Sequence, residues 1–599
     1  MTYKNLFTFL LFSLSYQYSV AQKIAAVEYD IKPNTFKDVT EQVRELINSF
    51  EDHDTLHVVF KEGRYDFYPE KAEKLKYFIT NTSSEVEYPS KIQQTGLYLK
   101  KRKNVIIDGQ NSTFVFHGKM ISWILDSCEN VTIKNLKIDY DRPGMSEIKF
   151  LEIGNDRIIG EVHADSKFDI INKKLFWYGH NWVTEHFFAL IVNKETGVNK
   201  YSSWDPFYKS DVRLIGNNIV EFTGDFKNFK ASKGEYLTIR DHYRDYVGAF
   251  IHRSKNIKLE NVHMKYMHGL GIVSQFSENL DFKKVYIKPD ANSGRVIASS
   301  ADGMQFSGCG GYINIDSCAY NGMHDDGINI HGTHLIVTAK DSIKNTIKLR
   351  FMHHQTYGFM PFSVNDELGV LKATTLKLHA YNKVKSTRRI SDRELELELT
   401  QSLKGIQIGD AIENMTWTPT VSIKNSHISG TQTRGILVST RKPVVIKNNT
   451  FYRTGMHAIL IENDATGWYE SGPVKDVLIE NNLFQECGYN SFPNNYVIQI
   501  SPHNTEVATN YWVHENIRIL KNTFKVYDYP ILSARSTKKI VFENNTILHT
   551  DFMNSGKERA SFKFDGCTDV HVKGNDFSKG LTPSIQLINM NNKDIKSKF

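Results

Sequence analysis

Three aspartates in a short stretch of the chain are the residues best suited to chemistry. Asp302 precedes Gly303, and Asp325 and Asp326 precede Gly327, so that Asp326 follows Asp302 by 24 residues. Carboxylates that lie close together repel one another, and this repulsion raises the pKa of at least one of them. A carboxylic acid beside an ionised carboxylate is the pair that hydrolyses a glycosidic bond. A calcium site and a solvated polar corner are the alternatives, because Asp-Gly pairs are common turn signals.

The segments around these aspartates recur with a similar spacing, which predicts how the aspartates stack. Six four-residue segments align by their apolar pairs, and they begin at Leu270, Asp302, Asp326, Arg434, His457 and Tyr496. If successive segments form neighbouring parallel strands, residues of one column lie about 4.8 Å apart. Asp302 and Asp326 are then direct neighbours, and Asp325 lies one residue before Asp326. Arg434 lies one strand beyond. Strict alternation would turn Asp326 inward, so we expect Gly327 to form a bend that lets both acids face solvent.

Further polar side chains should face the same groove as the aspartates. Sugars bind through a few polar groups and an aromatic platform. We therefore predict substrate contacts from Gln305, His324, Asn329, His331, Arg434, His457, Glu462, Trp468 and Gln499, with Trp468 as the platform. Each of these side chains is equally suited to a structural hydrogen bond. His331 and His334 have no fixed ligand set nearby, so neither a metal nor a cofactor is expected.

A repeat of about 23 residues predicts the frame that positions this groove. Short β-type segments that end in Asn recur along the chain, for example at 421–425 and 444–449. Two or three short strands in a repeat of this length are typical of one coil of a parallel β-helix. Asn suits the corners of such coils, because it tolerates a left-handed backbone and can hydrogen-bond along the stack. The sequence therefore predicts an all-β fold, a right-handed parallel β-helix.

Two stretches without Asn corners predict two inserted β-barrel-like domains, since both are rich in alternating strands. A helix expected within 38–50 would cap the open end of the solenoid. The predicted order along the chain is a signal peptide at 1–21, the cap and first coils at 22–140, the first insert at 141–246, coils with the aspartates at 247–334, the second insert at 335–415, and C-terminal coils at 416–599.

Composition and the first residues indicate an exported protein. The apolar stretch 6–14 is short and is followed by small residues at 19–21, as in a signal peptide, so we expect a periplasmic or secreted protein. No later segment is long enough to span a bilayer. The net charge of +7 is spread over 599 residues, which argues against a nucleic-acid partner. Five scattered cysteines argue against a disulfide framework. The inserts could pack a homodimer.

The stretches 300–303 (SADG) and 323–329 (MHDDGIN) resemble the Asp…Asp-Asp arrangement of polygalacturonase-type β-helix hydrolases. The Gly-His-Gly and Arg-Ile-Lys signatures of a true polygalacturonase are absent, which disfavours pectin as substrate. A closer resemblance covers nearly the whole chain. Through 104–109 (NVIIDG), 139–143 (DYDRP) and 324–332 (HDDGINIHG), the chain resembles glycoside hydrolase family 110, the bacterial exo-α-1,3-galactosidases.

This resemblance implies an inverting enzyme that removes terminal α-1,3-linked galactose, as in the blood group B determinant. It implies that Asp325 is the general acid and that Asp302 and Asp326 hold and activate water. The expected partners are galactose-terminated oligosaccharides or glycoconjugates. Other classes stay open: another β-helix polysaccharide hydrolase, a calcium-dependent lyase with clustered Asp as metal ligands, or a glycan-binding protein without activity.

Overall fold

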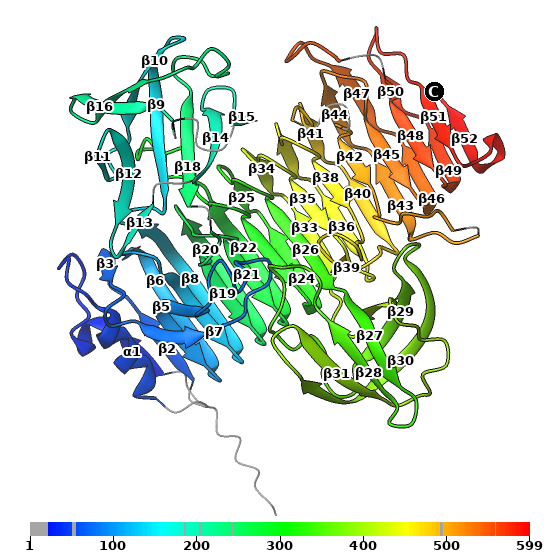
Figure 1. Ribbon diagram of the computed structural model, residues 1–599, viewed down its shortest axis with the longest axis horizontal. Coiled ribbons are helices and arrows are strands. Elements are labelled where there is room, and N and C mark those ends of the chain that lie inside the picture. The colour runs from blue at the N-terminus through cyan, green and yellow to red at the C-terminus, as the bar shows by residue number, and fades with distance from the viewer. Residues whose placement is uncertain are drawn as a thin grey trace, which may run out of the picture.

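Stacked coils of parallel strands run through the whole molecule (Figure 1). The computed structural model describes residues 22–50, 55–184, 187–202, 207, 209–241, 243–490, 495–508, 510–556 and 559–599. The expected right-handed parallel β-helix is confirmed by two long sheets in which almost all successive strands pair in parallel. The predicted signal peptide lies outside the described residues. In the described part of the chain, no helix is both long and apolar enough to cross a membrane.

One long sheet contains the strands that end at the Asn corners and those that follow them. Its members are β1 (Gln22–Ala25), β2 (Leu56–Val59), β3 (Arg64–Phe67), β6 (Lys103–Phe116), β8 (Glu129–Tyr140), β20 (Lys255–Met264), β22 (Glu278–Ile287), β24 (Gly310–Asp316), β25 (Ala319–Tyr320), β33 (Thr420–Lys424), β34 (His427–Ser429), β36 (Val444–Lys447), β37 (Thr450–Tyr452), β40 (Val477–Glu480), β41 (Leu483–Gln485), β43 (His514–Leu520), β44 (Thr523–Val526), β46 (Thr537–Glu543), β47 (Thr546–His549), β49 (Thr568–Lys573), β50 (Asp576–Phe577) and β52 (Ile595–Lys598).

The second long sheet includes the strands that directly follow Asp302, Asp326 and Arg434. In stacking order they are β4 (Glu73–Lys76), β5 (Ile92–Lys100), β7 (Ile121–Asp126), β19 (Ala249–His252), β21 (Ile272–Gln275), β23 (Met304–Ser307), β26 (Ile328–Thr333), β35 (Ile436–Val438), β38 (Ile459–Ile461), β42 (Ile498–Ile500), β45 (Leu532–Arg535), β48 (Phe562–Asp565) and β51 (Ile585–Ile588). A short strand, β39 (Glu470–Ser471), pairs with β26 in the antiparallel sense.

The core of the solenoid follows from the alternation of apolar residues along these strands. Ile423, Ile446 and Ile479 pair in register on successive coils, and all three are fully buried. At the next turn, Phe451 and Phe484 stack with ring centroids 4.9 Å apart. The N-terminal end is covered by α1 (Thr40–Asn48), whose Val43, Leu46 and Ile47 join the same core. The predicted cap is therefore confirmed.

Paired asparagines at the corners divide two tasks between them. The first Asn of a pair takes the left-handed backbone, as Asn448 does with φ 57° and Asn481 with φ 56°. The second Asn is buried and bonds to the next coil. Asn482 donates its Nδ2 to Oδ1 of Asn522 over 3.0 Å, and Asn449 donates to Oδ1 of Asn482 over 3.1 Å. These bonds form a ladder along the inside of the corner, so the predicted use of Asn is correct.

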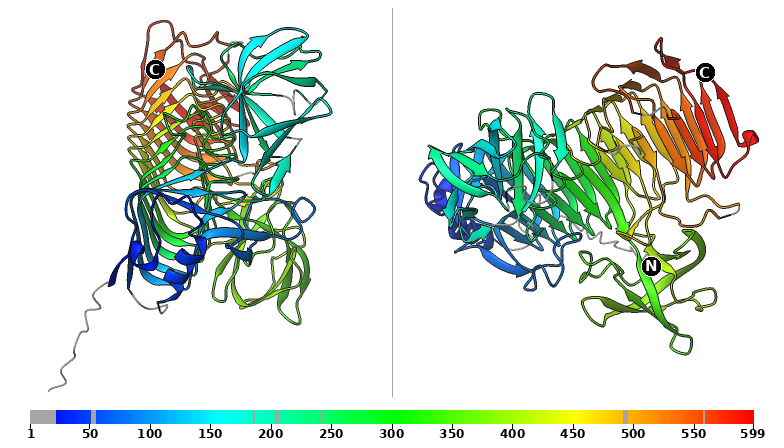
Figure 2. Two further views of the ribbon diagram at one scale, coloured as in Figure 1. Left: turned by 90° about the vertical axis from the view of Figure 1, so that its left-hand side faces the viewer. Right: turned by 45° about the horizontal axis from the view of Figure 1, so that its top comes forward.

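The two inserts project from the same side of the solenoid (Figure 2). The first forms an antiparallel sheet of β15 (Val198–Tyr201), β14 (Phe187–Asn193), β18 (Tyr236–Asp241), β9 (Met145–Ile153), β10 (Arg157–Val162), β17 (Ile219–Thr223) and β16 (Asp211–Gly216), with a small sheet of β11 (Phe168–Ile171), β12 (Lys174–Gly179) and β13 (Trp182–Thr184). The second forms a closed barrel of β27 (Leu335–Asp341), β28 (Thr346–Arg350), β31 (Glu394–Leu399), β30 (Lys377–Arg389), β29 (Glu367–Lys372) and β32 (Ala411–Asn414).

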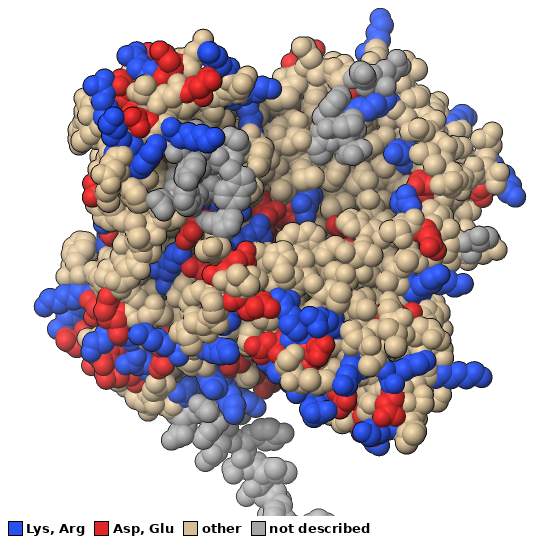
Figure 3. Space-filling model, viewed as in Figure 1, with Lys and Arg blue, Asp and Glu red and all other residues tan. Residues whose placement is uncertain are grey.

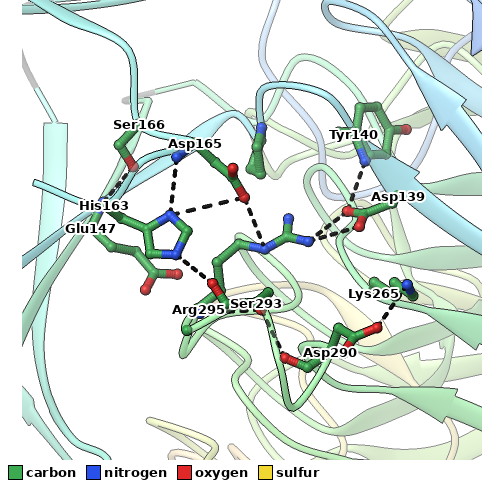
Figure 4. Close-up of polar contacts among 12 residues, drawn as sticks. Asp139, Tyr140, Glu147, His163, Asp165, Ser166, Lys265, Asp290, Ser293 and Arg295 are labelled. Carbon is green, nitrogen blue, oxygen red and sulfur yellow. Dashed lines mark hydrogen bonds and ion pairs between the residues drawn. The ribbon is translucent and has the colours of Figure 1, made fainter. Parts of the chain in front are cut away.

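A polar network fastens the first insert to the coil segment that leads to Asp302 (Figure 4). The buried Glu147 carboxylate accepts hydrogen bonds from the backbone N–H groups of the two residues that follow Arg295. The guanidinium of Arg295 binds both carboxylate oxygens of Asp139 at 2.8 Å. His163 Nε2 lies 2.8 Å from the carbonyl oxygen of Ser293. This network ties the base of the insert to the chain just before the predicted site.

The Asn ladder makes a testable contribution to stability. We expect Asn482→Ala to lower the free energy of unfolding by about 2–4 kcal/mol, because it removes several buried hydrogen bonds and leaves neighbouring polar groups without partners. The control is Asn481→Gly at the same corner, whose side chain is exposed and whose φ of 56° suits glycine. Urea unfolding of the two variants measures the difference. Equal unfolding midpoints for both variants would contradict the role of the ladder.

Candidate active site

The backbone register brings the predicted catalytic residues into one column. Met304 pairs with Ile328, and Ile328 pairs with Ile436. Asp302, Asp326 and Arg434 each lie two residues before these positions, so they occupy corresponding places on three successive coils. The backbone N–H of the glycine after Asp302 also donates to the Asp326 carbonyl over 2.9 Å. The predicted stacking is therefore confirmed, although the barrel is inserted between Asp326 and Arg434.

Two arginines and one hydroxyl hold the paired aspartates. Arg434 Nη2 lies 3.0 Å from Oδ2 of Asp326, and the Arg434 backbone N–H donates to Oδ1 over 2.9 Å. Arg244 Nη2 donates to Oδ2 of Asp325 over 2.6 Å. The Thr433 hydroxyl bonds to both carboxylates, to Asp325 over 3.1 Å and also to Asp326. The two neighbouring carboxylates thus accept from different arginines and share one hydroxyl.

The expectation that the bend at Gly327 lets both acids before it face solvent is wrong for Asp326. Asp302 is 3% exposed and Asp326 is 1% exposed. Contacts with Arg434 and Thr433 enclose Asp326, so the bend at the Asp-Gly pairs turns the carboxylate toward the next coil and not into water. Asp325 is the most accessible of the three, with its side chain 21% exposed.

Burial and mutual repulsion separate the proton affinities of the three carboxyls. Burial is the largest cause at Asp302, and the charges of Asp325 and Asp326 add to it, so the pKa of Asp302 lies well above its ordinary value. Burial and the charge of Asp325 raise the pKa of Asp326 to about 7 against the opposing charge of Arg434. Burial also acts to raise the pKa of Asp325, but Arg244 and Arg434 outweigh it and lower that pKa. The site therefore contains a neutral acid beside an ionised carboxylate.

Arg244 is the residue of this site that the sequence reasoning missed. It follows β18 and stands in the run 240–246, where the first insert returns to the coils. The segment has no repeat against which Arg244 could be aligned. The only signal was its position close to an insert boundary.

Two of the predicted groove residues, Gln305 and His331, connect into one chain of contacts. Gln305 Nε2 lies 3.0 Å from His331 Nε2, and the same His331 atom lies 3.5 Å from Glu470 Oε1. Asn81 donates to Glu470 over 2.8 Å. The predicted Asn329 follows Gln305 in register on the next coil, and its Oδ1 is buried without a hydrogen-bond partner. Glu470 and Asn81 were not among the predicted residues, because the short strand β39 and the segment between β4 and β5 do not follow the repeat.

Two predicted histidines are turned to protein partners. His324 Nε2 lies 2.7 Å from the hydroxyl of Thr238 on β18, and His457 Nδ1 lies 2.7 Å from the Tyr496 carbonyl. Burial is the largest cause that lowers the pKa of both rings, to about 4 for His457. Both histidines are therefore neutral at pH 7. Their proposed contacts with substrate stay predictions.

The remaining predicted residues lie on the coils beyond Arg434. Glu462 forms an ion pair with His503, and its charge also acts on Arg434. Gln499 lies on β42 with its Oε1 buried and unpartnered, and Trp468 is exposed on the loop before β39. Charged side chains of both signs border the hollow between the two inserts (Figure 3). Among the described residues, no group of three His, Cys, Asp or Glu is arranged to hold a metal ion.

Fold and site together define a right-handed parallel β-helix protein with a buried carboxylate site between two inserted β-domains. Family models match three parts of the chain: GLAA-B beta-barrel domain I at 146–237, GLAA-B beta-barrel domain II at 346–412, and a right handed beta helix region at 410–597. The chain belongs to glycoside hydrolase family 110.

Curated relatives match over nearly the full length. The chain is 42% identical to alpha-1,3-galactosidase A of Bacteroides fragilis, with 96% of this chain and 95% of the relative covered. It is 33% identical to alpha-1,3-galactosidase B of Bacteroides thetaiotaomicron, with 93% and 91% covered. Among solved structures, it is similar to the A-module of mannuronan C-5 epimerase AlgE4 of Azotobacter vinelandii, with a TM-score of 0.42, 9% identity, and 96% and 100% covered.

The raised pKa of Asp326 predicts a pH-dependent stability. The carboxyl releases its proton near pH 4 when the chain is unfolded, but near pH 7 when it is folded. Between these values the folded state binds more protons, so stability falls as pH rises from 4 to 7. We expect Asp326→Asn to reduce the difference between the urea midpoints at pH 4.5 and pH 7.5. Asp551→Asn, at a fully exposed position, should leave that difference unchanged. An equal pH difference in wild type and Asp326→Asn would refute the assignment.

Proposed function

We propose that the protein is an exo-acting, inverting α-1,3-galactosidase that removes terminal α-1,3-linked galactose from glycans such as the blood group B antigen, and also from linear Gal-α-1,3-Gal. The observation that carries this proposal is the carboxylate cluster, in which neutral and ionised aspartates lie side by side. Relatives that carry the name alpha-1,3-galactosidase support the substrate class. The partners are then galactose-terminated oligosaccharides or glycoconjugates.

In this proposal Asp325 is the general acid, because it is the carboxyl most accessible from the groove. Asp302 and Asp326 hold and activate the water that attacks the anomeric carbon from the opposite face. An inverting enzyme keeps its acid and base roughly 6.5–9.5 Å apart, which leaves room for that water. Because Asp302 and Asp326 bind the same water, the site needs three carboxyl groups and not two.

The charge distribution of the substrate-free site adds one requirement to these roles. The proton resides on Asp302 and Asp326, whereas Arg244 keeps Asp325 ionised. Asp325 therefore receives a proton when the sugar enters and sugar hydroxyls compete for Arg244. The same transfer turns the carboxyl that gave up the proton, Asp302 or Asp326, into an anion that can accept the proton of the attacking water. One proton moved within the cluster thus prepares both the acid and the base.

The exported location belongs to the same proposal. The short apolar stretch 6–14 and the small residues at 19–21 support a cleaved signal peptide. Fractionation of producing cells would find the activity in the periplasm or the medium. Activity only in the cytoplasmic fraction would contradict it.

The decisive test is the configuration of the first product. Proton NMR should show β-galactose appearing before mutarotation when the purified protein acts on Gal-α-1,3-Gal. The first appearance of α-galactose would exclude inversion. An unsaturated product that absorbs in the ultraviolet and disappears with EDTA would identify a lyase instead. Binding of the glycan without any product would indicate a glycan-binding protein.

Two substrates whose leaving groups differ in how much they need protonation test the role of Asp325. Asp325→Asn should lower kcat on Gal-α-1,3-Gal by about 10²-fold to 10⁴-fold, the usual contribution of a general acid. The loss on α-galactosyl fluoride should be much smaller, because fluoride leaves with little assistance from an acid. Asp551→Asn is the matched control and should stay within about twofold of wild type. Equal losses on both substrates would rule out Asp325 as the acid.

A further inference from the structure

We propose that Trp468, with the ring of His353 packed against it, forms the binding surface for the sugar that leaves the reaction, so that the second insert takes part in substrate selection. This inference rests on the proposed galactosidase function and deepens it. Trp468 belongs to the loop that connects β38 to β39, whereas His353 belongs to the barrel, between β28 and β29.

The ring of His353 packs against the ring of Trp468. Their centroids lie 4.3 Å apart with 33° between the ring planes. Trp468 remains 42% exposed although it is a large aromatic residue. A sugar ring presents an apolar face of C–H groups, which packs on an aromatic surface of this kind. His353 therefore supports the indole from the barrel, and the exposed part of Trp468 is the platform for the sugar.

The pair lies within electrostatic reach of the residues that hold the carboxylate cluster. The charges of Arg244 and Asp464 both act on the imidazole of His353, so this ring lies within electrostatic reach of the arginine that holds Asp325. Glu470 follows Trp468 by two residues, and its negative charge helps to raise the pKa of Arg434. Burial, with the neighbouring positive charges, lowers the pKa of His353 to about 4, so the ring is neutral at pH 7.

The loop that carries Trp468 is held rigid by one buried carboxylate. Asp464 accepts hydrogen bonds from the backbone N–H groups of four successive residues, 466–469, which include Trp468 itself. His334 Nδ1 lies 2.8 Å from the Asp464 carbonyl oxygen. Because the loop is ordered before any ligand arrives, stacking on Trp468 costs little conformational entropy.

Arg393 of the barrel fixes the loop that carries His353. It donates to the carbonyl oxygens of His353 over 2.6 Å and of His354 over 2.7 Å, and its Nε donates to Glu85 over 3.0 Å. Its guanidinium also lies over the ring of Tyr357, 3.9 Å from the centroid. Arg393 is therefore a positioning residue for the platform, and it joins the barrel to the loop between β4 and β5.

Asn81 completes the connection between the segments that carry Trp468 and His353. It donates to Glu470 over 2.8 Å and accepts from the hydroxyl of Thr356 over 2.6 Å. Trp468 and His353 thus stand on loops that are bonded to a common third segment. Their relative placement is set by the protein and does not depend on a ligand.

The experiment compares a substrate that has a leaving sugar with one that has none. Trp468→Ala should raise KM for Gal-α-1,3-Gal by about 10-fold, which corresponds to about 1.4 kcal/mol of binding free energy. KM for α-galactosyl fluoride should stay within about twofold, because fluoride does not reach the platform. His353→Ala should also raise KM for Gal-α-1,3-Gal but not for α-galactosyl fluoride, by a smaller factor. Trp468→Phe should leave KM for Gal-α-1,3-Gal close to the wild-type value. The control is Trp512→Ala, whose ring packs under Lys538 on the C-terminal coils.

The outcomes separate this inference from the function on which it rests. Equal changes in both KM values, or no change in either, would overturn the platform while leaving a galactosidase. If Trp468→Ala fails to fold, as judged by its urea midpoint, Trp468→Phe and His353→Ala decide by the same comparison. Arg393→Gln should likewise raise KM for Gal-α-1,3-Gal only, because His353 is then no longer held in place. A wild-type protein that releases galactose from neither substrate would overturn the proposed function and the inference together.

Discussion

The constant register between neighbouring coils is the constraint on which the rest of this structure depends. Each turn of the chain returns to the same lateral position, because backbone hydrogen bonds and apolar columns allow no slip by one residue. This register survives long interruptions. Ile133 pairs with Leu259 across the first insert, and Ile328 pairs with Ile436 across the barrel. Whole domains are thus added at the coil edges without moving the column that contains the aspartates.

That same constraint forces like charges together, and the two arginines make the arrangement tolerable. Three carboxyls on adjacent coils cannot all ionise while they are nearly buried. Arg434 comes from the stack itself, whereas Arg244 comes from the end of the first insert. The solenoid therefore supplies one compensating charge by its own periodicity and receives the other from a domain inserted into it. Because the arginines offset the burial of Asp325 more fully than that of Asp302, the two carboxyls differ in pKa.

The fold and the column of site residues could be predicted from the sequence because both follow the repeat. The spacing from Asp302 to Asp326 is one coil, so their adjacency required only the period and the strand spacing. Arg244 could not be found in this way, since the insert that ends near it has no period. The burial of the aspartates was also out of reach, because it depends on how Arg434 and Thr433 enclose Asp326. Local repeats predict register, while enclosure depends on contacts between distant segments.

Asn81 and Glu470 give the structure a consequence for the order in which it assembles. Their side chains bond although 389 residues separate them along the chain. Coils contact mainly their neighbours, so the N-terminal turns can stack as soon as they are synthesised. The wall of the active site cannot, because its two sides meet only after the chain has extended beyond the barrel and β38. The first coils therefore wait for a partner 389 residues away, and the groove takes its final shape only after the chain has passed the coil that contains β38.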